Sequence, residues 1–344
     1  MVRKAALKGS IFIIIVIFIV SILDPIFVLK TEHRGKLIEG LYKHTGDSYD
    51  VVLMGSSHIN GGIDPNILWH QYGITSFNYA TGGQPIDITY YLLKEVLKNH
   101  NPSVVVIDVY YLGLTQEYGQ EGYVRSVLDN MRFSLNKLEA IANCAPLKDR
   151  INYLFPLLKY HDRWNQLTME DVKFDTSKTY YTKGFDAGTD RYGKDNSYTG
   201  STTETGDIPK KTEEYLNKII DLSKKEGFKL VFVDAPYDYN STNGFDDWVQ
   251  EPQKMFNKVA EIAKENNILF VNYNDKIDEI GLDFKNDMNN IGHLNIWGAS
   301  KVTKDFGEIL KENCNLADHR NDNKYAQWDK DYLSSEAACI LAEK

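Results

Sequence analysis

The stretch Asp50-Val51-Val52-Leu53-Met54-Gly55-Ser56-Ser57-His58 decides how the rest of the chain is interpreted. Four apolar residues run into a glycine and two serines, which predicts a short buried parallel strand that ends in a tight turn. Asp64-Pro65 follows and predicts the start of a helix, with an N-cap residue and a proline at the first helical position. Ser56 and Ser57 are therefore expected at a strand's carboxyl end, where ligands bind in open α/β sheets, although Gly-Ser-Ser alone is more typical of ordinary turns.

Apolar strands and helices alternate along most of the chain. Further strands are predicted over residues 74–79, 103–109, 229–233 and 268–271, and helices over 86–99, 212–225 and 246–266. Five strands that alternate with helices predict an α/β fold with a doubly wound parallel sheet. The region from about 115 to 208 is predicted as an insertion, helical over 123–170 and an aperiodic cap loop over 172–208.

A second motif lies near the end of the chain. Asn290-Ile291-Gly292-His293-Leu294-Asn295 precedes an amphipathic segment from Ile296 to Leu310. A Gly-x-Ser turn early in the domain, together with a histidine that follows an Asx residue by three positions, resembles the SGNH (GDSL-like) hydrolase superfamily. The resemblance covers roughly residues 48–312. It is nearest to the membrane-anchored extracytoplasmic branch that includes the teichoic acid D-alanine transfer protein and the alginate O-acetylation proteins.

The resemblance implies a flavodoxin-like three-layer α/β/α fold with strand order 2-1-3-4-5, and it implies roles for single residues. Ser57 falls on the nucleophile of the Gly-Asp-Ser block, and its backbone N–H falls in the oxyanion hole. His293 falls on the base of the Asp-x-x-His block. Asn290 stands where the family has the aspartate that orients this base, and an amide cannot supply the negative charge. Asp287, six residues before His293, is the alternative orienting residue.

The oxyanion hole is expected to draw on the segment after the second strand, Thr81-Gly82-Gly83-Gln84-Pro85. By the resemblance Gly83 donates a backbone N–H there, with Gly82 as the alternative. The family's Gly-x-Asn-Asp block has no asparagine here, because the chain reads Ile107-Asp108-Val109-Tyr110-Tyr111. Gln84 is therefore a further candidate donor.

The N-terminus predicts a membrane anchor. Arg3, Lys4 and Lys8 precede an apolar run over residues 9–29 that only Asp24 and Pro25 interrupt. About 20 apolar residues cross a bilayer, and no small-x-small cleavage site follows, so residues 1–29 are predicted as a cytoplasmic tail and an uncleaved transmembrane signal anchor. Residues 30–48 are predicted as a connector with a helix from Lys36 to His44. Basic residues flank the run on both sides, so the expectation of an extracytoplasmic domain depends on the short tail and the resemblance.

Composition narrows the remaining function classes. The chain has 344 residues and a net charge of −9, which argues against nucleic acid as the main partner. Cys144, Cys314 and Cys339 lack metal-ligand spacing, so neither a metal site nor a cofactor is expected. The hydrolase-like domain is predicted over 49–313, followed by a polar tail over 314–344 that ends in a marginal helix from Leu333 to Glu343.

Together these observations and the resemblance predict a single-pass, cell-membrane serine acyl-transfer enzyme. It would be an O-acetyltransferase or O-acetylesterase that acts on a cell-envelope polysaccharide, and a membrane-bound O-acyltransferase would be its partner in the first case. The missing aspartate and asparagine favour an alternative, a catalytically weak or inactive glycan-binding or assembly protein on the same scaffold. The sequence leaves both hypotheses open.

Overall fold

A five-stranded parallel sheet in the order β2-β1-β3-β4-β5 forms the centre of the protein, as predicted. The structure is a computed structural model that describes residues 2–29, 32–43, 49–173 and 175–342. The strands are β1 (Val51–Met54), β2 (Ser76–Asn78), β3 (Val104–Asp108), β4 (Lys229–Asp234) and β5 (Leu269–Asn272). β1 and β3 are buried along their whole length, which explains their almost uninterrupted apolar sequence.

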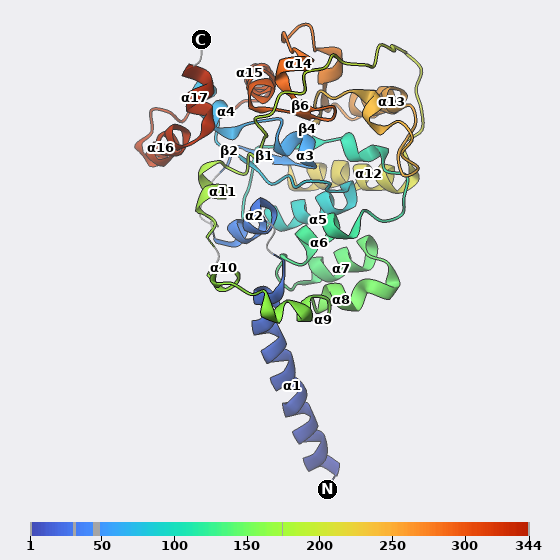
Figure 1. The fold of residues 1–344 in the computed structure, drawn as a ribbon, viewed down its shortest axis with the longest axis vertical. Helices are drawn as coiled ribbons and strands as arrows, with labels where there is room; N and C mark the ends of the chain where they lie inside the picture. The colour runs from blue at the N-terminus through green and yellow to red at the C-terminus, as the bar shows by residue number, and fades with distance from the viewer. Residues whose placement is uncertain (1, 30–31, 44–48, 174, 343–344) are drawn as a thin grey trace.

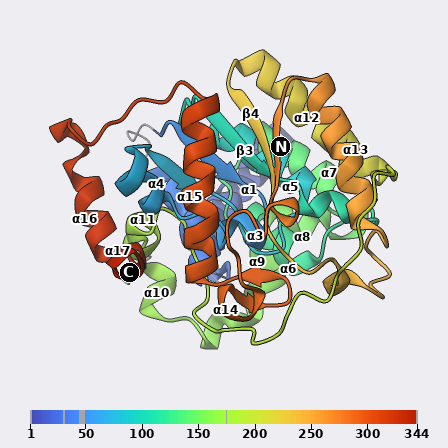
Figure 2. The ribbon, with the colours of Figure 1, turned by 90° about the horizontal axis from the view of Figure 1, so that it is seen from above.

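Helices cover both faces of this sheet (Figure 1, Figure 2). Helices α5 (Ile86–Val96), α12 (Lys210–Glu226) and α13 (Pro252–Glu265) cover one face, and α4 (Pro65–Tyr72) and α15 (Ile296–Asn313) cover the other. Successive strand residues alternate between the two cores: Val52 packs on the first face and Val51 on the second. The α/β/α fold expected from the sequence is confirmed.

The insertion consists of short helices. They are α6 (Glu121–Leu128), α7 (Leu135–Cys144), α8 (Arg150–Leu154), α9 (Leu157–Tyr160), α10 (Met169–Val172) and α11 (Ser177–Tyr181). Short 3-10 helices lie at Tyr110–Gly113 (η1), Leu147–Asp149 (η2), His161–Asn165 (η3), Tyr239–Thr242 (η4), Tyr273–Asp275 (η5) and Asn323–Tyr325 (η6). The helix expected over 246–266 starts only at Pro252, because a proline lacks the N–H group and is favoured at the first helical position.

The N-terminal segment forms a long helix that projects from the domain (Figure 1). Helix α1 (Val2–Phe27) is apolar and long enough to cross a membrane from Arg3 to Phe27, and its most apolar window is not buried in the protein. The connector contributes α2 (Glu32–Lys43), whose Leu37, Ile38 and Leu41 are fully buried in the core. His44, the predicted end of this helix, lies outside the described residues.

The C-terminal segment contains two packed helices, α16 (Ala326–Ser334) and α17 (Glu336–Ala342), where a polar tail was expected from the sequence. Trp328 on α16 is buried against Trp69 of α4, with ring centroids 5.4 Å apart, and near Tyr49 at 6.2 Å. Trp69 also donates its indole N–H to Asp329, at 2.9 Å. These contacts make α16 part of the domain; residue 343, the predicted end of the last helix, is outside the described residues.

Replacement of Trp328 by alanine should therefore destabilise the whole domain. Truncation of a large buried side chain leaves a cavity and costs about 3 kcal/mol or more in a core. Thermal unfolding of the full chain in detergent micelles would measure the loss. Leu333→Ala on the same helix is the control, because a side chain that is 72% exposed should change stability by no more than about 0.5 kcal/mol. Equal melting of both variants would mean that α16 is not part of the cooperative unit.

Candidate active site

The turn Gly55-Ser56-Ser57, called the serine turn below, follows β1 directly. Gly55 has a φ of +138°, a value that side chains rarely adopt, and a Cβ on it would lie 2.4 Å from the Asp108 Cβ. Ser56 caps the four-residue helix α3 (Ser57–Asn60), whose first residue is Ser57. The tight strand-to-helix turn thus requires glycine at position 55 and places two adjacent hydroxyl groups at the sheet's carboxyl edge.

Asp108 distinguishes the two serines. It ends β3, next to β1, and one of its carboxylate oxygens accepts hydrogen bonds from the Ser56 N–H at 2.9 Å and the Ser56 hydroxyl at 2.5 Å. The other oxygen accepts from the Tyr110 N–H at 3.0 Å. Burial raises the pKa of Asp108, while the hydrogen bonds from Ser56 and Tyr110 oppose this rise. Asp108 was missed in the sequence analysis, although a lone carboxylate at the end of an apolar strand was a usable signal.

His293 lies in a small hairpin outside the main sheet. Strands β6 (Met288–Asn290) and β7 (His293–Leu294) pair antiparallel, and Asn290 and His293 are direct partners across them. A two-residue connection places residues three apart in sequence opposite each other, so the Asn-x-x-His spacing follows from the hairpin. The His293 Nε2 lies 2.8 Å from the Ser57 Oγ, and its Nδ1 lies 3.1 Å from the Asn290 Oδ1.

These contacts define the protonation state of the imidazole. The Asn290 Oδ1 also accepts the Gly292 backbone N–H at 2.9 Å, which orients the amide with its oxygen toward the hairpin. An amide oxygen only accepts, so the Nδ1 of His293 must carry the proton and donate it to Asn290. Nε2 is then the acceptor for the Ser57 hydroxyl, which is the arrangement that a general base requires. Burial lowers the pKa of His293, so the ring is neutral at pH 7.

Asp287 does not bind the imidazole. It ends α14 (Phe284–Asp287), and its carboxylate accepts hydrogen bonds from the Lys301 ammonium at 2.6 Å and from the Asp283 N–H at 2.7 Å. The structure therefore places Asn290, and not Asp287, at the Nδ1 of His293. The reason is that α15 presents a lysine to this carboxylate, a contact that sequence distance to His293 does not reveal.

The insertion loop braces the hairpin. Asn295 is fully buried; its side-chain oxygen caps α15, and its amide donates to the carbonyls of Asp190 at 3.0 Å and Asn286 at 2.7 Å. The Ile296 N–H donates to the Gly188 carbonyl at 3.0 Å. Residues of the cap loop predicted over 172–208 thus hold the segment that carries His293, a role that was not anticipated from the sequence.

The loop after β2, residues 81–85, lies against the serine turn, because the Thr81 N–H donates to the Gly55 carbonyl at 3.0 Å. Gly83 has a φ of +67°, and a Cβ on it would lie 2.2 Å from the Tyr123 ring, so both the backbone and the packing require glycine. Gln84 is fully buried, with its amide bonded to the hydroxyls of Thr81 and Thr89, each at 2.9 Å. The structure therefore assigns Gln84 to bracing this loop and not to an oxyanion hole; Gly83 remains a candidate.

An aromatic wall adjoins the base. The His58 ring stacks on Tyr110 with centroids 3.7 Å apart, meets Tyr237 edge-on at 5.2 Å, and lies 4.8 Å from the His293 ring. Burial, and to a lesser extent the nearby His293, lowers the pKa of His58 well below its usual range. The neutral, buried His58 therefore packs its ring between Tyr110 and the imidazole of His293. His58 follows Ser57 directly in the sequence, but nothing in the sequence indicated this packing of its ring.

Comparisons with known proteins yield distant similarities. No protein-family model matches the sequence, and no curated protein does. Among solved structures, a candidate acylhydrolase from Bacteroides fragilis has 13% identity and a TM-score of 0.38, over 76% of this chain and 86% of its own. A candidate lipolytic protein of the G-D-S-L family from Desulfitobacterium hafniense has 13% identity and a TM-score of 0.39, over 76% of this chain and 98% of its own. A gut microbial diltiazem-metabolizing enzyme has 14% identity and a TM-score of 0.29, over 77% of this chain and 46% of its own.

The hydrogen bond from His293 to Asn290 predicts the effect of restoring an acid. The general base must be neutral, so the rate of ester cleavage should rise with pH through a His293 pKa that lies below the ordinary value of about 6.5. In Asn290→Asp the carboxylate stabilises the imidazolium, which should move this acid limb to higher pH and raise the plateau rate about 10-fold or more. Asn290 is exposed, so the new charge stays hydrated. The measurement is kcat/KM for p-nitrophenyl acetate as a function of pH.

Asp287→Asn is the matched control for this prediction. It removes the ion pair with Lys301, so it should lower stability and leave the position of the acid limb unchanged. A shift of the limb in Asp287→Asn, with none in Asn290→Asp, would mean that Asp287 orients the base in solution.

Proposed function

We propose that the protein is a membrane-anchored serine acyl-transfer enzyme, an O-acetyltransferase or O-acetylesterase that acts on a cell-envelope polysaccharide. The single observation that supports this most is the 2.8 Å contact between the Ser57 Oγ and the His293 Nε2, with the far nitrogen of the ring bonded to Asn290. A hydroxyl that donates to a neutral, oriented imidazole is the arrangement of an activated nucleophile.

The proposed reaction has two half-steps. In the first, the Ser57 Oγ attacks the carbonyl carbon of an acyl ester while His293 takes the hydroxyl proton, and the backbone N–H groups of Ser57 and Gly83 stabilise the oxyanion. His293 then gives the proton to the leaving alkoxide, which leaves an acyl-serine. In the second half-step His293 deprotonates either water or a sugar hydroxyl, which attacks the acyl-serine. The bond between the acyl carbon and the Ser57 Oγ breaks, and His293 returns the proton to this oxygen, which regenerates Ser57. Water makes the protein an esterase, and a sugar hydroxyl makes it a transferase.

A cavity beyond the aromatic wall supports a glycan as the substrate. It has a volume of about 240 Å³ and is lined by two tyrosine rings and several amides, including Tyr198, Tyr239, Asn240, Asn243 and Gln253. Aromatic faces and amide groups suit the C–H faces and hydroxyls of sugar rings. The Tyr239 ring packs on Tyr237 at 4.9 Å, and Tyr237 in turn contacts His58, so a row of buried rings lies between this cavity and the Ser57–His293 pair.

Helix α1 supports the membrane part of the proposal, because it is long and apolar enough to span a bilayer once. With α1 inserted and its N-terminus in the cytoplasm, the domain would lie outside the cytoplasm, where envelope polysaccharide is found. In the transferase case, a membrane-bound O-acyltransferase would deliver the acyl group to Ser57.

A second candidate is a catalytically weak or inactive glycan-binding protein. Asn290 favours it, because an amide at the orienting position cannot stabilise an imidazolium by charge. The same cavity would then bind the glycan without turnover.

Active-site labelling of the full chain in detergent distinguishes the two candidates. We expect a fluorophosphonate probe to label the wild type, because its phosphorus is attacked only by an activated serine. Ser57→Ala should abolish the labelling, whereas Ser56→Ala, the matched control, should only slow it by loosening the turn held by Asp108.

Labelling that survives Ser57→Ala would reject Ser57 as the nucleophile. A wild type that resists the probe yet binds polysaccharide would support the second candidate.

A further inference from the structure

The end of α1 is bonded to the insertion and not only connected through the chain. The Asp24 carboxylate accepts the Leu157 N–H of α9 at 2.7 Å, and the Arg163 guanidinium of η3 donates to the carbonyls of Phe27 and Val28. Figure 1 shows α8, α9 and α10 along the edge of the domain from which α1 projects. These contacts set the position of the insertion relative to the helix.

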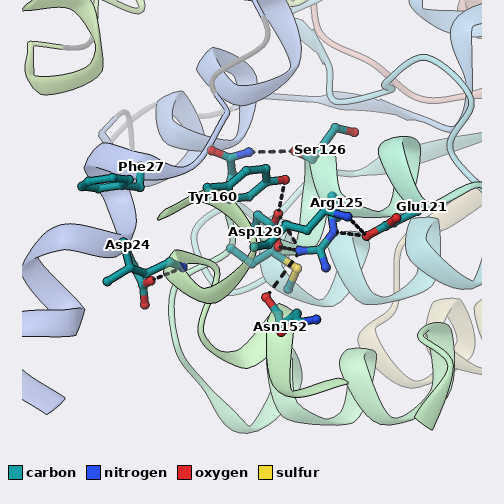
Figure 3. A network of polar contacts seen from close by, with 12 residues as sticks. Asp24, Phe27, Glu121, Arg125, Ser126, Asp129, Asn152 and Tyr160 are labelled. Atoms are coloured by element: carbon teal, nitrogen blue, oxygen red, sulfur yellow. Dashed lines mark hydrogen bonds and ion pairs between the residues drawn. The ribbon is translucent and has the colours of Figure 1, made fainter. Parts of the chain in front are cut away.

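A largely buried polar network connects the helices at this edge (Figure 3). Arg125 on α6 is buried and pairs with Glu121 at 2.7 Å and Asp129 at 3.2 Å. Tyr160 of α9 donates its hydroxyl to Asp129 at 2.8 Å, and Arg125 also donates to the Asn152 carbonyl of α8 at 3.4 Å. The network joins α6, α8 and α9 into one unit beside the end of α1.

This same edge exposes large apolar side chains. Between residues 133 and 172 eight of them are exposed, whereas the rest of the described domain from residue 49 onward exposes only Phe245 and Leu333. Six form what we call the apolar rim, each between 51% and 78% exposed: Leu147, Ile151, Leu158, Trp164, Met169 and Val172. An exposed apolar cluster of this kind marks a surface that contacts a membrane or another protein.

The length of α1 places the rim at the level of a bilayer interface. From Lys8 to Phe27 the helix has twenty residues and extends about 30 Å, which is the thickness of the hydrocarbon core. With Lys8 at one interface, Phe27 reaches the other, and there it meets η3 and α9. Trp164 is the residue type that is enriched at this depth.

We propose that the apolar rim lies in the headgroup region of the bilayer that α1 spans, so that the domain rests on the membrane in one fixed orientation. This proposal depends on the membrane anchoring in the proposed function. The segment 147–173 carries five basic residues (Lys148, Arg150, Lys159, Arg163 and Lys173) and four acidic ones, so apolar contact, and not attraction to anionic lipid, holds the rim. Zwitterionic lipid is therefore sufficient.

The proposal can be tested with fluorescent labels on the protein and quenchers in the lipid. Single cysteines at Leu158 and at Trp164, in a background with Cys339→Ser and the two buried cysteines retained, would carry the environment-sensitive dye NBD. The full chain is reconstituted in phosphatidylcholine vesicles with a nitroxide lipid quencher near the headgroup. We expect both labels to lose about half of their emission or more, because interfacial residues insert about 5–10 Å into this layer.

Two control positions make the outcome decisive. A label at Leu333, which is as exposed as Trp164 but lies on α16, should be quenched by aqueous iodide and not by the lipid nitroxide. A label at Phe18 within α1 should be protected from iodide and quenched by a nitroxide deeper in the acyl chains. Failure at Phe18 would reject the anchoring itself. Quenching at Phe18 with a Leu333-like response at Leu158 and Trp164 would reject the rim alone, as would labels there that neither quencher reaches, because another protein would then cover them.

Discussion

The hydrogen bond between the Ser57 hydroxyl and the His293 Nε2 constrains most of the structure around the site. Its two partners lie far apart in the sequence, near the two ends of the domain, and belong to different kinds of structure. Ser57 is positioned by the main sheet, through the turn at Gly55 and through its neighbour Ser56, which donates hydrogen bonds to Asp108 on the adjacent strand. His293 is held by a hairpin that needs both the cap of α15 and the cap loop. The hydrogen bond therefore joins two segments whose positions depend on the sheet, on α15 and on the cap loop.

The uncharged Asn290 changes what this arrangement requires of its surroundings. A carboxylate at that position would need hydration or a cation, as Asp287 illustrates with its bond to Lys301. For the Asn290 amide, a hydrogen bond from the Gly292 N–H is enough to direct its oxygen toward His293. Asn290 is exposed, so water can also reach the amide. The consequence is that backbone geometry orients the imidazole of His293, while Asn290 offers its charged form no negative charge.

The predictable parts of this molecule are those that local sequence determines. The strands of the sheet are short apolar runs ended by turn residues, and the pairing of Asn290 with His293 follows from a two-residue hairpin. Contacts between distant segments escaped prediction. Asp108 reaches Ser56 across adjacent strands, Lys301 takes the carboxylate of Asp287, and Trp328 finds Trp69 some 260 residues earlier in the chain. Gln84 has the right residue type near the right loop, but its amide groups are already bonded to two threonines.

The separation of 236 residues between Ser57 and His293 has a consequence for the newly made chain. Chains are synthesised from the N-terminus at about 5–20 residues per second, so the serine leaves the ribosome at least roughly ten seconds before the histidine. Until the hairpin docks, Ser57 is an ordinary alcohol with no base beside it. The order of synthesis thus delays the pairing: the contact between Ser57 and His293 cannot form before most of the chain has been made.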